Sequence, residues 1–549
     1  MNSFFKTKIL NLKAGLKKPP EPYIEQLKRK ANTFEQLSFM EITAEKLDLY
    51  IQELKNSGAN GSDTIPAFVM KDAHQIWHKE ILHLLNLSLC TGIFPDCLKI
   101  TKILPSVKRG KPANLPSSYR PISSLNMLAK ILERAGFDQL QQHCDRNQII
   151  CEDQHGGRAK HSTTTCLIET QECIQEAKDK KLKSALMAID LSAAYDLCSH
   201  DVLDQQLRLC GTDQHARGWI LSFLGNRTQF VEVEGTRSTS SQALGMGLCQ
   251  GGRSSGILFA IHTNQLPSSA KTCSPAKSPR ANQHKVSIKQ FVDDTNAIIS
   301  AKSTKQLGKM IQMTYNLLEK HLTLLGMAIN GDKTQLMLIN PDLESTQVEL
   351  KAGGISITHQ HTLKVLGYTF SEDLKTDEYI WRGKDNLLSS IRKKVSMLRV
   401  LKPYMEKGIL TNTANMLINS QITYLAPLWN LASRGNKNKV QTAQIKAARQ
   451  LTWTKGAHNV QKSHRQDLLT SLGWMNIDQI LNQATIQLVK KAATNQSSAA
   501  INRMFNMHDG TTKRPKYKCL IFTADTKKRN AHNILDIGKA AFNQLAPEL

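Results

Sequence analysis

Two adjacent aspartates, Asp293 and Asp294, lie between two apolar runs in the stretch "SIKQFVDDTNAIISAK", residues 287–302. Both runs have the composition of β-strands, so Ile288 to Val292 and Ala297 to Ser300 predict a hairpin whose turn falls at the two acids. Burying two unpaired carboxylates is strongly unfavourable, so such a site must supply positive charge or protons. A bound divalent metal ion would supply that charge.

A third acid, Asp190, interrupts the apolar run Ala185 to Leu191, which has the length of a buried strand. Three carboxylates suit Mg²⁺, a hard cation that keeps coordination positions open for substrate phosphates, and Mn²⁺ is an alternative. Two such ions about 3.5 to 4 Å apart can stabilise the attacking and leaving oxygens of a phosphoryl transfer. The three aspartates therefore predict a two-metal site.

Each acid also has a simpler interpretation. An Asp-Asp pair is common in hairpin turns for conformational reasons alone, and Asp190 could be a strand-end acid in a salt bridge. The order of the elements favours the catalytic interpretation: a strand with one acid, a Gly-rich turn leading into a helix, and then a hairpin with two acids.

The charge balance indicates a polyanionic partner. The chain has 549 residues, enough for two to four domains, and 72 Lys and Arg against 46 Asp and Glu give a formal charge of +26 and a pI near 9.6. The excess is uneven, because residues 411–450 contain five basic residues and no acid. Any single basic run could be a solvated face, but their sum favours nucleic acid.

Cysteine usage and hydropathy indicate the compartment. The eleven cysteines are scattered without a C-x-x-C pair or zinc-ligand spacing, as expected in a reducing environment. The opening residues lack the apolar core of a signal peptide, and no run of about 18 apolar residues occurs. We expect a soluble, intracellular protein without a membrane association, and the sequence does not decide between nucleus and cytoplasm.

The elements that would position the acids can be recognised from periodicity. Residues 40–100 predict helices, the basic loop "VKRGKPANLPSS" follows, and "YRPISSLNMLAKILERAGFDQLQQ" predicts an extended segment and then a helix. "CQGGRSSGILFAIHTNQL" predicts a Gly-rich turn and a helix. Residues 267–286, rich in Pro, Ser and Lys, predict a surface loop, and a helix is expected around residues 304–326.

Beyond residue 370 the sequence predicts helices only. One helical stripe holds six apolar residues, with three basic residues away from it. The apolar stripe is Leu387, Leu388, Ile391, Val395, Leu398 and Leu401, and the basic residues are Arg392, Lys393 and Arg399. A separate α-helical domain is therefore expected from about residue 375.

Seven motifs resemble, in order, those of the reverse transcriptases of LINE-type (non-LTR) retrotransposons. They are "SSYRPISSLN", "HGGRAKHSTTTCL", "AIDLSAAYD", "GLCQGGRSSGILF", "FVDDT", "GMAINGDKTQLML" and "VLGYTF". The upstream segments "LKNSGANGSDTIPAFVMKDA" and "LLNLSLCTGIFPDCLKITKILP" resemble jockey-like elements. The resemblance covers most of the chain from about residue 35.

The resemblance implies an α+β right-hand polymerase with fingers, a palm that carries an antiparallel sheet, and a helical thumb, followed by an α-helical C-terminal region. On this basis we expect an N-terminal helical extension at residues 1–86, a reverse transcriptase domain at 87–370, a thumb at 371–470 and a basic C-terminal region at 471–549.

The resemblance also implies roles for individual residues. Asp190 would be the first metal ligand, and Asp293 and Asp294 the paired ligands on the hairpin. Tyr195 stands where the family has an aromatic residue that crowds the sugar 2′ position and so favours deoxynucleotides. Gly367, in "VLGYTF", would belong to the hairpin that holds the primer end.

The remaining implied residues would bind the nucleotide. Basic side chains of the fingers motif would reach the triphosphate, since phosphates need charge-assisted donors. A Gln-Gly pair would position the nucleotide and the template base, with the glycine permitting close approach of the backbone. A later lysine would lie near the leaving pyrophosphate. These residues are Lys108, Lys111, Arg120, Gln250, Gly251 and Lys333.

The chain departs from the family at four positions. Cys249 replaces a usual Pro, Gly252 a usual Ser, Gly256 a usual Pro, and Gly157 a usual aromatic residue. Extra glycine raises backbone freedom, so the nucleotide pocket is expected to be looser. The roughly 35 residues before the resemblance are too few for the endonuclease domain that jockey-like proteins carry, so an upstream domain is expected to be missing.

The sequence thus predicts an RNA-directed DNA polymerase that uses an RNA template, a DNA primer and deoxynucleoside triphosphates. One alternative is another right-handed polymerase, such as a viral RNA-dependent RNA polymerase or a maturase. Val292 before the acid pair, where the viral enzymes have Gly, and Tyr195 weigh against the viral alternative. The other alternative is a catalytically impaired, element-derived RNA-binding protein.

Overall fold

The computed structural model describes residues 1–16, 23–30, 33–56, 60–108, 110–242, 245–271, 284–342, 348–451, 465–504, 507–508 and 519–520. The chain divides into two compact units, each built from three stretches of chain. Unit 1 comprises Met1–Ala159, Asp190–Thr272 and Thr314–Lys333, and unit 2 comprises Lys160–Ile189, Cys273–Met313 and Thr334–Leu549. Among the described helices, none has both the length and the apolar character needed to cross a membrane.

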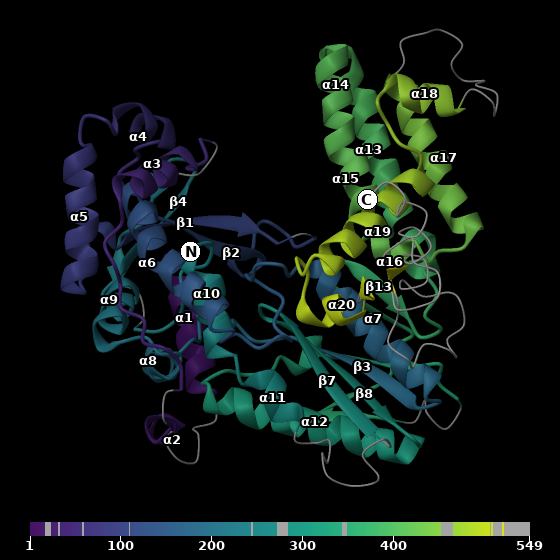
Figure 1. Ribbon diagram of the computed structural model, residues 1–549, viewed down its shortest axis with the longest axis horizontal. Coiled ribbons are helices and arrows are strands. Elements are labelled where there is room, and N and C mark those ends of the chain that lie inside the picture. Colours follow the sequence, from purple (N-terminus) through teal and green to yellow (C-terminus); the bar gives the residue numbers. More distant parts are fainter. Residues whose placement is uncertain are drawn as a thin grey trace. The chain divides into compact units, whose positions relative to one another are not determined.

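The helices of unit 1 pack around Trp219, which is fully buried. The rings of Phe94, Phe137 and Phe223 lie 5.5, 5.7 and 6.2 Å from the Trp219 ring, measured between centroids. The long helix α6 can approach this cluster because it has Gly136 at the contact, where a Cβ would lie 2.6 Å from the indole. Figure 1 shows α6 between α3, α9 and α10.

The helices of unit 1 are α1 (Asn2–Ala14), α2 (Tyr23–Lys28), α3 (Ala44–Gln52), α4 (Ala67–Ala73), α5 (His78–Thr91), α6 (Met127–Arg146), α8 (His200–Leu209), α9 (Gln214–Leu224), α10 (Ser254–His262) and α11 (Leu266–Lys271).

The strands of unit 1 form a small sheet in the order β2-β1-β4-β5, with β6 also paired to β4. They are β1 (Ile100–Val107), β2 (Tyr119–Ser124), β4 (Thr228–Val233), β5 (Thr236–Arg237) and β6 (Ser241–Gln242). β1 and β2 are antiparallel, with Val107 opposite Tyr119, so the basic loop predicted from the sequence connects these two strands.

Unit 2 contains an antiparallel sheet in the order β7-β8-β3-β9. Its strands are β3 (Lys183–Ile189), β7 (His284–Phe291), β8 (Asp294–Ala301) and β9 (Gln335–Ile339). From Thr295 to Ala301, β8 is buried throughout, which explains the apolar run Ala297 to Ile299 at its centre. Helix α7 (Thr163–Asp179) packs on this sheet and is seen crossing β3 and β8 in Figure 1.

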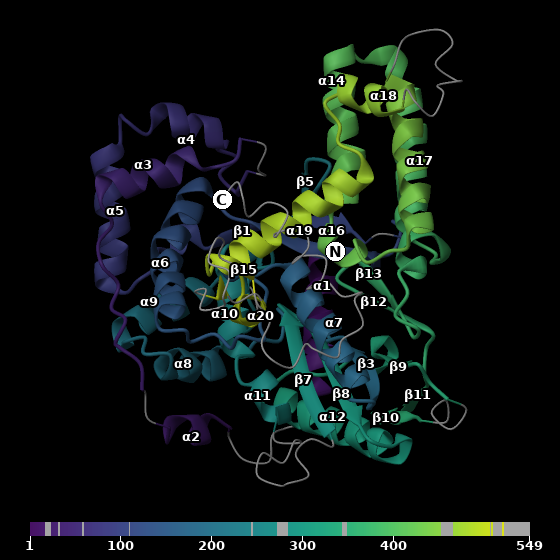
Figure 2. The same ribbon diagram turned by 45° about the vertical axis from the view of Figure 1, so that its right-hand side comes forward.

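Two short hairpins and a helical bundle complete unit 2. The hairpins pair β10 (Leu350–Ala352) with β11 (Ile355–Ile357), and β12 (Thr362–Val365) with β13 (Tyr368–Ser371). Figure 1 shows α13 between α14 and α17, Figure 2 shows α17 beside α18, and α13 and α17 are in contact. The helices are α13 (Leu387–Leu401), α14 (Lys407–Ala414), α15 (Ser420–Thr423), α16 (Ala426–Trp429), α17 (Arg434–Leu451), α18 (Arg465–Ser471), α19 (Ile477–Ala493) and α20 (Ala499–Met504).

Several predicted elements are confirmed. The helix expected around 304–326 is α12 (Thr304–Leu324), which passes from unit 2 into unit 1. The stripe helix is α13, with Leu387, Leu388, Ile391 and Leu398 buried. The mixed α+β class is likewise confirmed by the described helices and sheets.

Three expectations were wrong in detail. The loop expected at residues 267–286 contains α11 at its start and β7 at its end, and residues 272–283 lie outside the described part. The region beyond 370 is not purely helical, because β14 (Met507–His508) pairs with β15 (Cys519–Leu520). The strand expected to reach Leu191 ends at Ile189. Beyond this strand, Leu191 forms an isolated β-bridge with Ile329.

Candidate active site

The two adjacent aspartates lie at the β7–β8 hairpin, but the turn is one residue earlier than expected. Its two connecting residues are Val292 and Asp293, and Asp294 is already in β8, opposite Phe291. Val292 has φ +59°, a left-handed conformation that is strained for a β-branched residue. Asp293 and Asp294 are exposed, whereas β8 is buried from Thr295 onward. The hairpin therefore presents both carboxylates at the end of an apolar ribbon.

Asp190 is one residue beyond β3, the strand that pairs with β8. The register places Ile189 opposite Thr295 in antiparallel strands. The residue after Ile189 and the residue before Thr295, which are Asp190 and Asp294, therefore leave this strand pair at the same end. The sequence pattern of one acid-bearing strand and one acid-bearing hairpin thus corresponds to two paired strands.

Asp190 has a cationic neighbour in unit 1. Lys333 Nζ donates to Asp190 Oδ2 at 3.2 Å, and the backbone N–H of Asn330 donates to the Asp190 carbonyl at 2.8 Å. The Asp190 carboxylate thus already has one cationic group, the Lys333 ammonium, at its Oδ2 atom. With Asp293 and Asp294 it would offer hard oxygen donors, the set that Mg²⁺ prefers.

Among the described residues, one group of three ligand-type side chains lies within 4.8 Å, and it contains none of these aspartates. It consists of His359, His361 and Glu372. His359 Nδ1 accepts the Leu338 N–H at 3.0 Å, so a neutral His359 carries its proton on Nε2 and donates to Glu372 Oε2 at 2.8 Å. A metal ion could bind Nε2 of His359 only if this nitrogen lost its proton. We therefore interpret the three side chains as a hydrogen-bonded cluster.

The Gly-rich loop before α10 is joined to the segment that carries Tyr195. The Leu248 N–H donates to the Tyr195 carbonyl at 2.8 Å, and Gln250 Nε2 donates to Asp196 Oδ1 at 2.8 Å. The Tyr195 ring lies 5.0 Å from the Phe259 ring, tilted by 32°. Gln250 is thereby held beside Tyr195 and Asp196, which lie more than 50 residues earlier in the sequence.

Gly251 is placed where only glycine fits well. Its φ is +99°, and a Cβ would lie 3.3 Å from Ile122 Cγ2. The adjacent Gln250 carbonyl accepts the Ser123 N–H at 2.8 Å, so the loop continues the edge of β2. Gly251 therefore lies against β2, and its expected contact with the nucleotide stays a prediction.

Lys108, in the β1–β2 loop, has other cations nearby. Lys108 Nζ donates to the Ser117 carbonyl at 2.8 Å, which fixes its side chain within the loop. Burial lowers the pKa of Lys108, and nearby cations lower it further. These cations are Lys8, Lys333, Arg120 and Lys111. Like charges repel, so each of these cations disfavours the charged form of Lys108.

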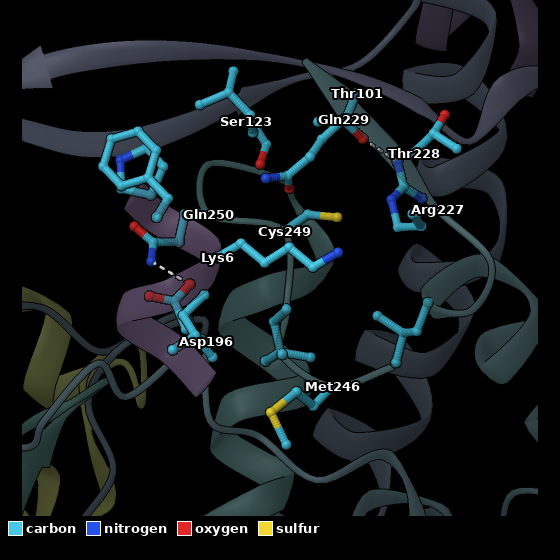
Figure 3. A pocket seen from close by; sticks show the side chains of 17 residues that line it. Lys6, Thr101, Ser123, Asp196, Arg227, Thr228, Gln229, Met246, Cys249 and Gln250 are labelled. Atoms are coloured by element: carbon cyan, nitrogen blue, oxygen red, sulfur yellow. Dashed lines mark hydrogen bonds between the residues drawn. The ribbon is translucent and has the colours of Figure 1, made fainter. Parts of the chain in front are cut away.

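A cavity of about 100 Å³ lies beside Asp196 and Gln250, between α1, β1, β4 and the Gly-rich loop (Figure 3). Its polar lining includes Lys6, Asp196, Arg227 and Gln250. Burial raises the pKa of Asp196, while the Gln250 hydrogen bond and Lys8 act to lower it. Asp196 and the lysines of α1 were not given a role from the sequence.

Gly367 lies in the two-residue turn of the β12–β13 hairpin in unit 2. Leu366 and Gly367 both have positive φ, +48° and +83°, as a type I′ turn requires. Tyr424 covers the turn: its hydroxyl donates to the Leu366 carbonyl at 2.7 Å, and a Cβ on Gly367 would lie 3.4 Å from its ring. The predicted hairpin at "VLGYTF" is confirmed.

The predicted site residues thus fall in both units. Unit 1 holds Asp190 and all the residues expected to bind the nucleotide, and unit 2 holds the other two metal ligands and the hairpin glycine. The unit 1 residues are Lys108, Lys111, Arg120, Asp190, Tyr195, Gln250, Gly251 and Lys333, and those of unit 2 are Asp293, Asp294 and Gly367.

Comparison with known families identifies the class of domain that carries these residues. Residues 107–370 match the family model of reverse transcriptase (RNA-dependent DNA polymerase). The chain therefore carries a reverse transcriptase domain, and this domain includes every residue assigned above to metal, nucleotide or primer.

The chain is related to the polymerases of jockey-like mobile elements, as its motifs predicted. It is 25% identical over 378 residues to the probable RNA-directed DNA polymerase from transposon BS of Drosophila melanogaster, covering 67% of this chain and 40% of that protein. It is 24% identical over 416 residues to the RNA-directed DNA polymerase from mobile element jockey of the same species, covering 75% and 44%. The chain spans less than half the length of these relatives.

Proposed function

We propose that this protein is an RNA-directed DNA polymerase that extends a DNA primer on an RNA template. The pairing of β3 with β8 carries the proposal, because it joins the strand that precedes Asp190 to the strand that begins with Asp294. A structural salt bridge at Asp190 would not require a partner strand with two more exposed acids. The match of residues 107–370 to the reverse transcriptase family supports the same conclusion.

The residues divide the chemical work between them. Asp190, Asp293 and Asp294 would hold two Mg²⁺ ions, or Mn²⁺ in their place. When bound, such ions supply positive charge to the attacking and leaving oxygens in phosphoryl transfer. Lys108, Lys111, Arg120 and Lys333 would bind the triphosphate by charge-assisted hydrogen bonds.

The neighbouring residues would select and position the nucleotide. Tyr195, whose ring lies against that of Phe259, would crowd the 2′ position of the sugar and favour deoxynucleotides. Gln250 and Gly251 would contact the nucleotide and the template base, with Gly251 allowing the backbone to approach. Gly367 would hold the primer end through the turn of its hairpin.

We expect Asp293→Asn to reduce primer extension by at least about 100-fold, because a neutral amide is a poor ligand for a hard cation. The measurement is extension of a labelled DNA primer on an RNA template with Mg²⁺ and with Mn²⁺. Binding of the template–primer duplex should be unchanged. Asp385→Asn, an exposed aspartate of unit 2 outside the site, is the matched control.

Equal extension rates for Asp293→Asn and Asp385→Asn would contradict the metal assignment. Supplying ribonucleotides and deoxynucleotides in parallel tests the choice of substrate. Incorporation of ribonucleotides alone would favour an RNA-dependent RNA polymerase instead.

A second candidate is an RNA-binding protein without catalysis, and a groove in unit 2 favours it. A cavity of about 200 Å³ between α13 and α17 is lined by Arg392, Lys439 and Lys446 together with the hydroxyls of Ser396 and Thr442. None of the described lining residues is acidic. Tight, salt-dependent RNA binding without extension under either metal would support this candidate over the polymerase.

A further inference from the structure

A buried ion pair joins the β7–β8 hairpin to helix α7 within unit 2. Lys289 Nζ of β7 donates to Glu169 Oε2 of α7 at 2.5 Å. The two residues are 7% and 2% exposed, so the pair is largely shielded from water. Separating two buried charges is strongly unfavourable, and the pair therefore ties this point of β7 to α7.

The second oxygen of Glu169 is bound from the C-terminal part of the chain. Ser498 Oγ donates to Glu169 Oε1 at 2.6 Å, and Ser498 is 1% exposed. A carboxylate that has one oxygen on an ammonium group and the other on a hydroxyl group has a fixed orientation. Glu169 thus connects Lys289, 120 residues later in the chain, with Ser498, 329 residues later.

The segment that holds Ser498 is itself anchored to α7. The Ser498 carbonyl accepts the Asn502 N–H at 2.8 Å, which opens α20, and Ile501 of this helix is fully buried. Figure 1 and Figure 2 both show α20 beside α7, and the two helices are in contact. Before α7 begins, Lys160 Nζ donates to the Asn495 carbonyl at 2.8 Å. The Ser498 hydroxyl therefore approaches Glu169 from a defined position.

The ion pair lies close to the end of the strand that leads to the expected metal ligands. Lys289 is opposite Asn296 in the register, and Phe291, the last residue of β7, is opposite Asp294. Lys289 is thus two residues before the end of β7 and four before Asp293. A strand in a closely packed interior transmits displacement along its length, so a shift at Lys289 also displaces the turn.

We propose that Ser498 is a positioning residue for the metal site: acting through Glu169 and Lys289, it fixes the turn that carries Asp293. This inference rests on the proposed polymerase function. It brings a segment beyond residues 107–370, the part of the chain that matches the reverse transcriptase family, into the geometry of the metal ligands.

The test removes one hydroxyl group and leaves the buried ion pair in place. Ser498→Ala should raise the KM for Mg²⁺ in primer extension about three- to tenfold, with a small change in kcat at saturating Mg²⁺, because Glu169 loses a contact that orients it. Ser498→Thr keeps the hydroxyl group and should restore most of the affinity. Ser497→Ala, which removes the hydroxyl of the preceding buried serine, is the matched control and should behave like the wild type.

Binding of Mn²⁺ to the full chain, measured by electron paramagnetic resonance, gives a readout that does not need catalysis. Asp293→Asn should abolish this binding, which attributes it to the metal site. Ser498→Ala should weaken it about three- to tenfold, and Ser497→Ala should not.

A purely structural role for Ser498 would give a different result. Ser498→Ala would then have a lower unfolding temperature, but the same Mn²⁺ affinity and the same KM for Mg²⁺ as Ser497→Ala. If the wild type extends primers, that result overturns the inference and the polymerase proposal stands.

If the wild type extends no primer with either metal, the proposed function fails, and the Mn²⁺ measurement then decides the inference alone. Weaker binding in Ser498→Ala than in Ser497→Ala would retain the positioning role at a metal site. Equal binding in the two variants would remove it.

Discussion

The carboxyl of Glu133 lies directly behind the Gly-rich loop. Glu133 Oε1 accepts hydrogen bonds from Ser254 N at 2.9 Å and Ser254 Oγ at 2.6 Å. Burial raises the pKa of Glu133, although these hydrogen bonds act to lower it. A Cβ on Gly252 would lie 2.8 Å from the same oxygen, so at this position the glycine makes room for Glu133 and does not simply loosen the loop.

The raised pKa of Glu133 predicts a pH dependence of stability. A folded-state acid with a raised pKa holds its proton to higher pH than in the unfolded chain, so its contribution falls as pH rises through that range. Glu133→Gln keeps the acceptor oxygen and cannot ionise. We expect it to be as stable as the wild type at pH 5 and more stable at pH 8, as measured by urea unfolding.

Glu133→Leu is the contrasting variant, because it leaves Ser254 without its acceptor and should cost about 1 to 3 kcal/mol at both pH values. A Gln variant less stable than the wild type at pH 8 would show that the charged carboxylate is the stabilising form.

At the scale of single residues, the sequence indicated candidate residues but not the contacts that hold them. Asp190, Asp293 and Asp294 could be recognised because adjacent acids in apolar strands are costly without a function. The hydrogen bond from Gln250 to Asp196 could not, since it joins residues 54 apart that no periodicity relates.

At the scale of elements, the β12–β13 hairpin and the Tyr424 side chain that covers its turn can be tested by substitution. Gly367→Ala should destabilise through its positive φ and through the Tyr424 ring 3.4 Å away, by about 1 to 2 kcal/mol. It should also reduce primer extension if this turn holds the primer. Thermal unfolding and extension assays measure the two effects.

Gly353→Ala is the matched control for this hairpin. Gly353 also has a positive φ, +57°, but a Cβ there would meet nothing within 4 Å. It should show the backbone cost alone and normal extension. A Gly353 variant that loses extension to the same degree would mean that the effect is general and not specific to the primer hairpin.

Element positions were predictable where periodicity is strong. The α13 stripe and the β7–β8 hairpin were recovered because their apolar patterns follow the helix and strand periods, whereas the β12–β13 hairpin was expected from the resemblance of its motif to reverse transcriptases. The stretch "TANMLINSQITYLAPLWNLA" lies in the region expected to be helical, but its helices are interrupted, with a π-helical turn at Asn415–Asn419 and Leu425 at φ +55° before α16. Pro427 in the first turn of α16 explains a new helix start there. The one-residue shift of the Asp turn arose because apolar runs do not reveal which two residues connect them.

At the scale of the whole molecule, buried histidines should make the protein acid-sensitive. Burial lowers the pKa of His262 to about 4, and burial lowers that of His321 to about 4. An unfolded histidine titrates near pH 6.5, so below that pH the unfolded chain binds protons that the folded chain does not. Stability is therefore full above about pH 6.5 and is lost as pH falls toward 4.

We expect each of these histidines to lower the free energy of unfolding by about 2 kcal/mol when the pH falls from 7 to 5. His321→Gln should show a smaller fall in unfolding midpoint over this range than the wild type. His83→Gln, an exposed histidine of α5, should behave like the wild type. The same acid sensitivity in His321→Gln would contradict the assignment.

The interleaving of the two units has a consequence for synthesis on the ribosome. Strand β3 emerges with residues 183–189, but its neighbours β8 and β9 follow only at residues 294–301 and 335–339. Unit 1 likewise closes with the stretch that ends at Lys333. Neither unit can complete its fold until more than 330 residues have been synthesised. Until then the apolar strand β3 lacks its partner strands. Translation speed and chaperone supply should therefore limit the yield of native protein.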